Sequence, residues 1–216
     1  MRNIVVLISG RGTNLAALLQ AARHERWRDT LDADIVAVIS NRPQAAGLDV
    51  ARAAGVATAV VDHRSYAARA DFDAALTAEI DRHAPALVVL AGFMRVLTPA
   101  FVQHYTGQLV NIHPSLLPLF PGLRTHAQAL AAGVRVHGAT VHYVTDDIDA
   151  GGIIAQCVVP VLPGDDEAVL SARVLAQEHR LLPRAIRLLL QQRVRWDEGR
   201  VVVHEAAPGD LALLAS

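Results

Sequence analysis

The sequence predicts an α/β fold built on a doubly wound, mostly parallel sheet. Short runs of Val, Ile and Leu alternate with helical patterns from the first residues to about residue 110, which is typical of βαβ units. The apolar runs are continuous, as expected of strands that helices cover on both faces. A glycine-rich turn joins the first run to the first helix, so we expect the N-terminal half to be of the Rossmann type.

Start and stop signals bound the elements of this half. Gly55 follows one helical pattern, at the position where glycine commonly ends a helix. Ala84-Pro85 ends another, because the residue before a proline avoids the helical conformation. Thr98-Pro99 starts a short helix, with threonine as the N-cap. The expected strands cover 3–8, 34–40, 57–61, 87–91 and 109–112, and the expected longer helices cover 14–23, 45–54 and 70–83.

The pattern changes after about residue 117, where a proline-rich loop follows. We expect a long helix from Asp166 to about Gln191 after Pro163-Gly164, and a hairpin around Asp197-Glu198-Gly199. The tail from about Ala206 is expected to fray. The other expected elements are a short helix over 127–132 and strands over 137–144, 153–161, 193–196 and 201–204. With no repeat or linker in view, we interpret 1–216 as one domain with halves of about 1–110 and 111–205.

Composition excludes several classes of function. The 216 residues carry 20 basic and 21 acidic side chains, a net charge of −1, so we expect neither nucleic-acid nor membrane partners. The longest apolar stretch, 84–94, is far shorter than a membrane span. Every basic residue is arginine, which excludes Schiff-base chemistry and a Walker-A lysine.

Cysteine and histidine usage points away from metals and disulfides. Cys157 is the single cysteine, which excludes an internal disulfide and a cysteine-rich zinc site and suits a reducing, cytoplasmic location. Its apolar neighbours favour a buried, unreactive thiol. The ten histidines show no metal-ligand spacing, and we expect no metal.

The first candidate site is the turn Ser9-Gly10-Arg11-Gly12-Thr13-Asn14. Glycines let the backbone approach an anion, and the following helix offers free N–H groups and the positive end of its dipole. Leu15 replaces the third glycine of a dinucleotide fingerprint, and Asn41-Arg42 stand where an NAD site has an acid, so a phosphomonoester is favoured, with NADP as the runner-up. The alternative is a turn that only connects strand and helix.

The second candidate site combines Asn111, His113 and Asp149. Asn111 and His113 share one face at the end of a strand, where ligands bind in parallel sheets. An amide donor beside an imidazole can stabilise an oxyanion or move a proton. Asp149 lies in an acidic, glycine-rich loop with Asp146 and Asp147. The alternatives are a structural histidine and a solvated acidic turn or cation site, although the spacing lacks the rest of an EF-hand pattern.

Four segments in this order resemble the folate-dependent phosphoribosylglycinamide formyltransferases of purine synthesis. They are 8–15 (ISGRGTNL), 90–95 (LAGFMR), 111–118 (NIHPSLLP) and 138–142 (GATVH), the last leading to Asp149-Ala150-Gly151. The resemblance covers about residues 3–204. It implies a formyltransferase-like fold with a phosphate-binding first half and a folate-binding, catalytic second half.

The resemblance also implies an activity and its residues. The family transfers the formyl group of 10-formyltetrahydrofolate, a cosubstrate, to the amine of glycinamide ribonucleotide. The matching catalytic residues are Asn111, His113 and Asp149. The matching ribonucleotide-binding residues are Gly12, Thr13, Asn14 and Glu178. The matching folate-binding residues are Arg69, Met94, Arg95, Val96, Leu97, Val144, Asp146, Asp147 and Ile148.

Departures and competing interpretations remain. Leu119, Arg124 and Leu175 stand where the family often has lysine, histidine and a polar residue. A 10-formyltetrahydrofolate hydrolase shares the chemistry but usually carries an extra N-terminal domain. A methionyl-tRNA formyltransferase needs an RNA-binding domain and positive charge. A non-catalytic nucleotide-binding module is the third alternative, and a monomer or a homodimer is expected.

Overall fold

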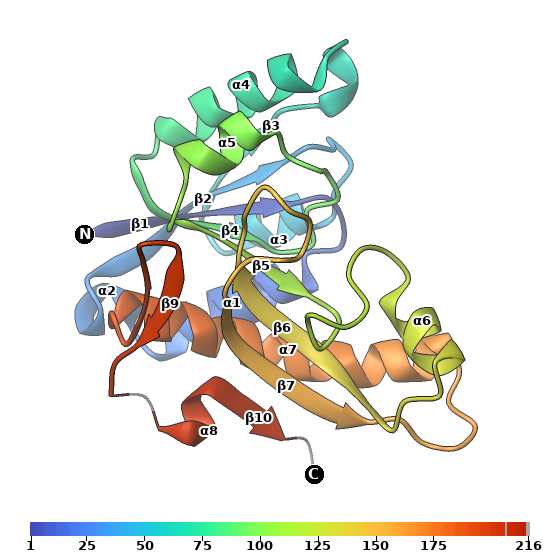
Figure 1. Cartoon of the computed structure of the whole chain (residues 1–216). Coiled ribbons are helices and arrows are strands. Elements are labelled where there is room, and N and C mark those ends of the chain that lie inside the picture. The colour runs from blue at the N-terminus through green and yellow to red at the C-terminus, as the bar shows by residue number, and fades with distance from the viewer. Residues whose placement is uncertain (206, 215–216) are drawn as a thin grey trace. The chain divides into compact units, whose positions relative to one another are not determined.

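The computed structural model describes residues 1–205 and 207–214 (Figure 1). The chain divides into two compact units, Met1–Asn111 and Ile112–Ser216. The sequence pattern changes near the same point. The interpretation of the chain as one domain with two functional halves stays a prediction.

The first unit is a parallel sheet with helices on both faces. Its strands lie in the order β3-β2-β1-β4-β5, and each neighbouring pair is parallel. The strands are β1 (Arg2–Ile8), β2 (Ala33–Ser40), β3 (Ala57–Val60), β4 (Pro85–Leu90) and β5 (Leu109–His113), the last running on into the second unit. The helices are α1 (Thr13–His24), α2 (Trp27–Thr30), α3 (Gly47–Ala53), η1 (His63–Ser65), α4 (Arg69–Asp81) and α5 (Pro99–His104).

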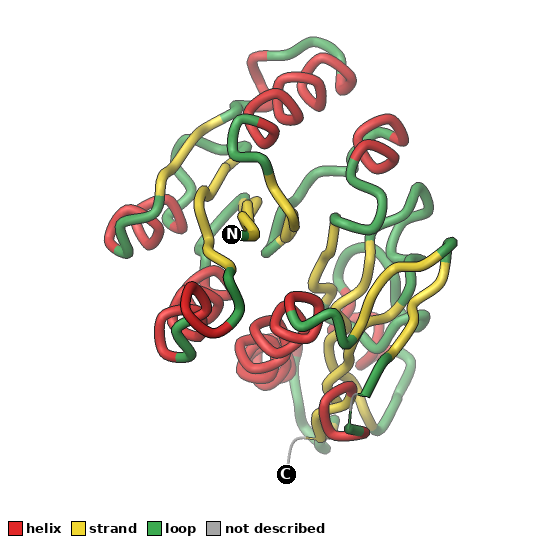
Figure 2. Tube along the Cα trace, turned by 90° about the vertical axis from the view of Figure 1, so that its left-hand side faces the viewer, coloured by secondary structure: helices red, strands yellow, loops and turns green. Residues whose placement is uncertain are grey.

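The strand order reverses direction beside β1. The chain steps from β1 outward to β3, then returns to place β4 on the other side of β1. Since such crossovers are right-handed, α1 and α3 cover one face and α4 and α5 the other (Figures 1 and 2). The central strand is fully buried from Ile4 to Ile8. The carboxyl ends of β1 and β4 therefore form the switch point at which open α/β sheets bind ligands.

The second unit has a different topology. Its strands β6 (Val136–Tyr143) and β7 (Ile153–Pro160) are antiparallel, and β10 (Ala212–Leu214) is parallel to β7. A short helix α6 (Thr125–Ala131) precedes β6, and the long helix α7 (Glu167–Leu190), capped by Asp166, packs on β6 and β7. A hairpin of β8 (Val194–Asp197) and β9 (Arg200–Val203) follows.

Close backbone approach fixes the β6–β7 pairing. A Cβ at Gly138 would lie 1.8 Å from the carbonyl oxygen of Cys157, so only glycine lets the strands come this close. The Cys157 thiol is fully buried, and burial raises its pKa to about 11. The expectation of a buried cysteine is confirmed.

The predicted fold class is confirmed, with corrections at its margins. The expectation of a frayed tail is wrong for residues 207–214, which contain helix α8 (Pro208–Leu211) and β10; Ala206 lies outside the described residues. The tail's apolar Leu213 pairs with Cys157 of β7, a long-range contact that local pattern does not reveal. The short helices α2 and η1 were not predicted. Across 1–205 and 207–214, no helix is long and apolar enough to span a membrane.

Candidate active site

The glycine turn Ser9–Asn14 leaves β1 and enters α1. Gly12 has φ 74° and precedes the first helical residue, Thr13, a left-handed conformation that favours glycine. A Cβ on Gly12 would lie 2.5 Å from the Cα of Gly47, and the amide of Gly47 donates to the carbonyl of Gly10 at 3.0 Å. The start of α3 therefore packs directly against the backbone of the turn. No side chain caps the start of α1, which leaves its first amides suited to an anion.

The segment after β4 is exposed in the same unit. Met94 is 63% exposed and Val96 is 50% exposed, while the Arg95 guanidinium lies 5.9 Å from the centre of the Phe72 ring. Leu97 is half-buried, and Arg69 is exposed at the first residue of α4. The exposed apolar side chains suit a ligand with an apolar body.

His113 ends β5, two residues after Asn111, and is 6% exposed. Its Nδ1 lies 3.4 Å from Oδ2 of Asp149, and its Nε2 lies 3.1 Å from the carbonyl oxygen of Phe120. Both ring nitrogens thus face oxygen acceptors. A ring nitrogen can donate to its acceptor only while it carries a proton.

Asp149 is held by backbone geometry as well as by histidines. It has φ 53°, and its Oδ2 accepts a hydrogen bond from the amide of Gly122 at 2.8 Å. Its Oδ1 lies 3.7 Å from Nε2 of His142. Burial lowers the pKa of His142. The structure therefore brings His113 and Asp149 together, as the sequence predicts, and adds His142, Phe120 and Gly122, to which the sequence analysis gave no role.

The remaining predicted residues of the second unit lie around this centre or along α7. Val144 is half-buried, and Asp146, Asp147 and Ile148 are exposed on the loop that leads to Asp149. Glu178 is buried in α7, 7% exposed.

A histidine pair lies beside the centre. Nδ1 of His126 lies 3.2 Å from Nε2 of His137, and the His137 ring packs edge-on against Phe120. Burial, with a smaller contribution from His126, lowers the pKa of His137 to about 4. An uncharged pair can share one N–H···N bond, and the His137 ring contacts the residue whose carbonyl faces His113.

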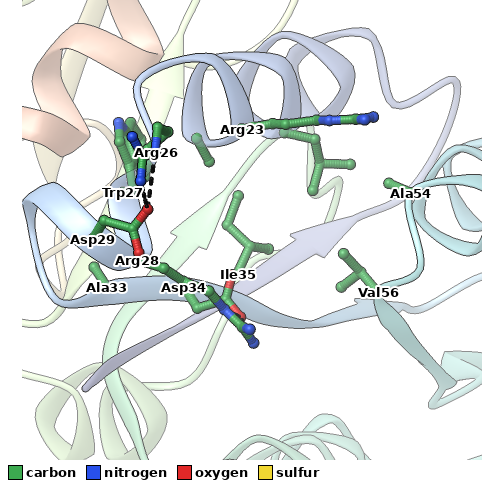
Figure 3. Close-up of a pocket in the computed structure, with 12 residues that line it drawn as sticks. Arg23, Arg26, Trp27, Arg28, Asp29, Ala33, Asp34, Ile35, Ala54 and Val56 are labelled. Carbon is green, nitrogen blue, oxygen red and sulfur yellow. Dashed lines mark hydrogen bonds and ion pairs between the residues drawn. The ribbon is translucent and has the colours of Figure 1, made fainter.

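A separate cavity of about 360 Å³ opens in the first unit, beside the start of β2 (Figure 3). Figure 3 shows Arg26 bonded to Asp29 among its lining residues, and Arg28 pairs with Asp34 at 2.6 Å. The glycine turn follows the opposite, carboxyl end of β1. Within the part of the chain that the structure describes, no three His, Cys, Asp or Glu residues gather as a metal site.

Known proteins are similar to this chain in sequence and in fold. The sequence profile of the formyl transferase family matches residues 2–186. The chain is 48% identical over 204 residues to phosphoribosylglycinamide formyltransferase of Escherichia coli, covering 92% of this chain and 94% of that protein. Glycinamide ribonucleotide transformylase 1 of Symbiobacterium toebii has a TM-score of 0.89 and 45% identity, covering 95% of both chains.

A structure with a different printed activity is also similar. A formyltetrahydrofolate deformylase of Pseudomonas syringae has a TM-score of 0.84 and 32% identity over 94% of this chain and 66% of that one. The profile match and the high identity to whole relatives decide the family. The chain, with its glycine turn and its buried histidine–aspartate centre, belongs to the formyl transferase family.

Proposed function

We propose that the protein transfers the formyl group of 10-formyltetrahydrofolate to the amine of glycinamide ribonucleotide, in purine biosynthesis. The observation that carries the proposal is the buried pair of His113 and Asp149, 3.4 Å apart, at the end of the strand that bears Asn111. The 48% identity to the phosphoribosylglycinamide formyltransferase of Escherichia coli supports glycinamide ribonucleotide as the acceptor.

These residues lower the reaction barrier by stabilising the negative charge that develops on the formyl oxygen. The amine nitrogen of the ribonucleotide attacks the formyl carbon, a C–N bond forms, and the carbonyl electron pair moves to oxygen. The His113 imidazolium and the Asn111 amide donate hydrogen bonds to that oxygen, and the nearby Asp149 carboxylate stabilises the imidazolium. The formyl oxygen replaces the Phe120 carbonyl, which holds Nε2 of His113 at 3.1 Å.

Collapse of the tetrahedral intermediate completes the transfer. The electron pair on oxygen re-forms the carbonyl, and the bond from the formyl carbon to the folate nitrogen breaks. The proton lost by the attacking amine goes to that nitrogen, with Asp149 and His113 moving it. The amine must be neutral and His113 must be charged, so activity is expected to follow a bell-shaped pH profile.

The remaining assignments belong to the same proposal. Gly12, Thr13 and Asn14 hold the ribonucleotide phosphate at the start of α1, and Glu178 accepts hydrogen bonds from the ribose hydroxyls. The folate-binding residues are Arg69, Met94, Arg95, Val96, Leu97, Val144, Asp146, Asp147 and Ile148. The single buried thiol suits a reducing, cytoplasmic compartment. A monomer or homodimer stays the expected state.

Hydrolysis of the same folate is the second candidate, favoured by the likeness to a deformylase. An absorbance assay of folate turnover with 10-formyltetrahydrofolate distinguishes the two. Turnover only in the presence of glycinamide ribonucleotide supports the transferase. Equal turnover and formate release without it identify a hydrolase. Nucleotide binding without turnover identifies a binding module.

A further inference from the structure

Ser9 joins three loops at the switch point of the first unit. It follows the last residue of β1, is the first residue of the glycine turn, and is 4% exposed. Its hydroxyl lies 2.6 Å from Oδ1 of Asn41, which follows β2, and accepts from the backbone amide of Met94 at 2.7 Å. The Ser9 amide also donates to the carbonyl of Gly92 at 3.1 Å. One small side chain therefore contacts the loops after β1, β2 and β4.

The chemistry of these groups fixes the direction of both bonds. The Met94 amide can only donate, so the Ser9 oxygen accepts. The hydroxyl proton is then free to go to the Asn41 side-chain oxygen, which can only accept. Asn41 is fully buried. Loss of the Ser9 hydroxyl would leave a buried acceptor and a backbone donor without their partner, which is costly.

Buried side chains hydrogen-bond to both ends of the loop from Phe93 to Thr98. Ser9 holds its beginning through Met94. At its far end Oδ2 of Asp73, a 3% exposed residue of α4, accepts from the amide of Thr98 at 2.6 Å. Of these two, only Ser9 is also part of the glycine turn. Exposed Met94 lies at the first of these two attachments, and exposed Val96 lies between them.

We propose that Ser9 is a positioning residue that couples the glycine turn to the loop 93–98, so that binding of the ribonucleotide phosphate at the turn raises the affinity of the folate for the loop. The inference rests on the proposed function, which places the two ligands at these segments. A bound phosphate restricts the motion of the turn and so holds the Ser9 hydroxyl in place. The hydroxyl in turn holds the Met94 amide, and with it the loop, in the conformation that binds the folate. By linkage the folate strengthens ribonucleotide binding by the same factor.

The coupling is measurable by isothermal titration calorimetry. Tetrahydrofolate is titrated into the wild-type protein with and without saturating glycinamide ribonucleotide, and the ratio of the two dissociation constants is the coupling factor. We expect a factor of about ten, within the usual range for linked sites. Ser9→Ala is expected to reduce this factor to nearly one while both ligands still bind singly.

Two variants distinguish a loss of coupling between the two ligands from a general increase in the mobility of the loop. Asp73→Ala releases the far end of the loop, so tetrahydrofolate is expected to bind more weakly while the coupling factor stays at its wild-type value. Ser40→Ala removes a buried hydroxyl that hydrogen-bonds to the backbone of Arg42, and it is expected to keep both affinities. If Ser9→Ala does not fold, Ser9→Cys, whose thiol bonds weakly, takes its place with an intermediate factor.

Amide hydrogen exchange gives an independent readout. The Met94 amide is expected to exchange about tenfold faster in Ser9→Ala, in keeping with the loss of one hydrogen bond. An unchanged coupling factor in Ser9→Ala would overturn the proposal, as would a wild-type factor of one or an equal loss in Asp73→Ala. A wild-type protein that binds neither ligand would instead refute the proposed function, and this inference with it.

Discussion

Replacing Asp149 with asparagine tests the centre of the proposed mechanism. The substitution keeps the size and planar shape of the side chain and retains an oxygen for the Gly122 amide, 2.8 Å away. It removes the negative charge that faces Nδ1 of His113 and Nε2 of His142. Turnover should fall while the fold persists, because the charge stabilises an imidazolium that matters most when the formyl oxygen becomes negative.

The separation of the charges sets the size of the effect. At 3.4 Å from Nδ1 to Oδ2, a full ion pair is worth about 5 kcal/mol at an effective dielectric constant near 20. Water screens part of this, since the Asp149 side chain is 13% exposed, and we take about 3 kcal/mol as the loss. That corresponds to a fall in kcat of roughly 100-fold.

Steady-state absorbance assays across pH 5–9, with a thermal melt of each protein, measure the effect. Asp197→Asn is the matched control, since its partner Arg195 lies in the β8–β9 hairpin and both side chains are half exposed. The expected result for Asp149→Asn is a lower kcat with a nearly unchanged KM for the ribonucleotide and a similar melting temperature. Activity within threefold of wild type throughout would refute the reasoning. Parallel losses of activity and stability would assign Asp149 a structural role.

Three further predictions concern stability. Gly138→Ala places a Cβ 1.8 Å from a carbonyl of the facing strand and should cost at least about 3 kcal/mol in urea unfolding, whereas Gly209→Ala, with open space around it, should change little. The guanidinium of Arg173 lowers the pKa of Asp165 from 3.8 to about 2, so the pair stabilises the fold above about pH 4 and loses its effect as the pH falls towards 2. The melting temperatures of wild type and Arg173→Gln should therefore converge over that interval, and a constant difference would contradict the assignment. Burial lowers the pKa of His137 from 6.5 to about 4, so the folded state resists protonation and loses stability as the pH falls from 6.5 to 4. His137→Gln should flatten that dependence, and an unchanged slope in unfolding measured at pH 7, 5.5 and 4.5 would count against it.

Local signals predicted the strands and the longer helices of the first unit well, because start and stop residues mark their ends. Thr98 caps α5 and accepts from the amide of Phe101, as its position before Pro99 predicts. Strand β4 begins at Pro85 itself, two residues before the expected start, because the first residue of a strand can lack its N–H.

What the sequence could not give is contact between distant segments. The proximity of His113 and Asp149 depends on the loop between β6 and β7, and spacing alone does not determine it. The Phe120 carbonyl and the Gly122 amide are backbone groups, which leave no residue-type signal. The pairing of β10 with β7 joins residues that lie more than 50 positions apart in the sequence. Local pattern does not reveal such a contact, so the sequence predicted a frayed tail instead of a strand.

The buried thiol and the lysine-free composition make the chain selective towards chemical labels. Only thiolate reacts with maleimides, and Cys157 has a pKa of about 11, so it presents roughly 300-fold less thiolate at neutral pH than an ordinary exposed cysteine with a pKa near 8.5. A cysteine introduced at Leu123, which is 77% exposed, would carry a fluorophore at that one position without removal of the native thiol. Because the sequence contains no lysine, amine-directed reagents would mark the α-amino group alone, so two different dyes could be placed on one molecule for distance measurements during turnover.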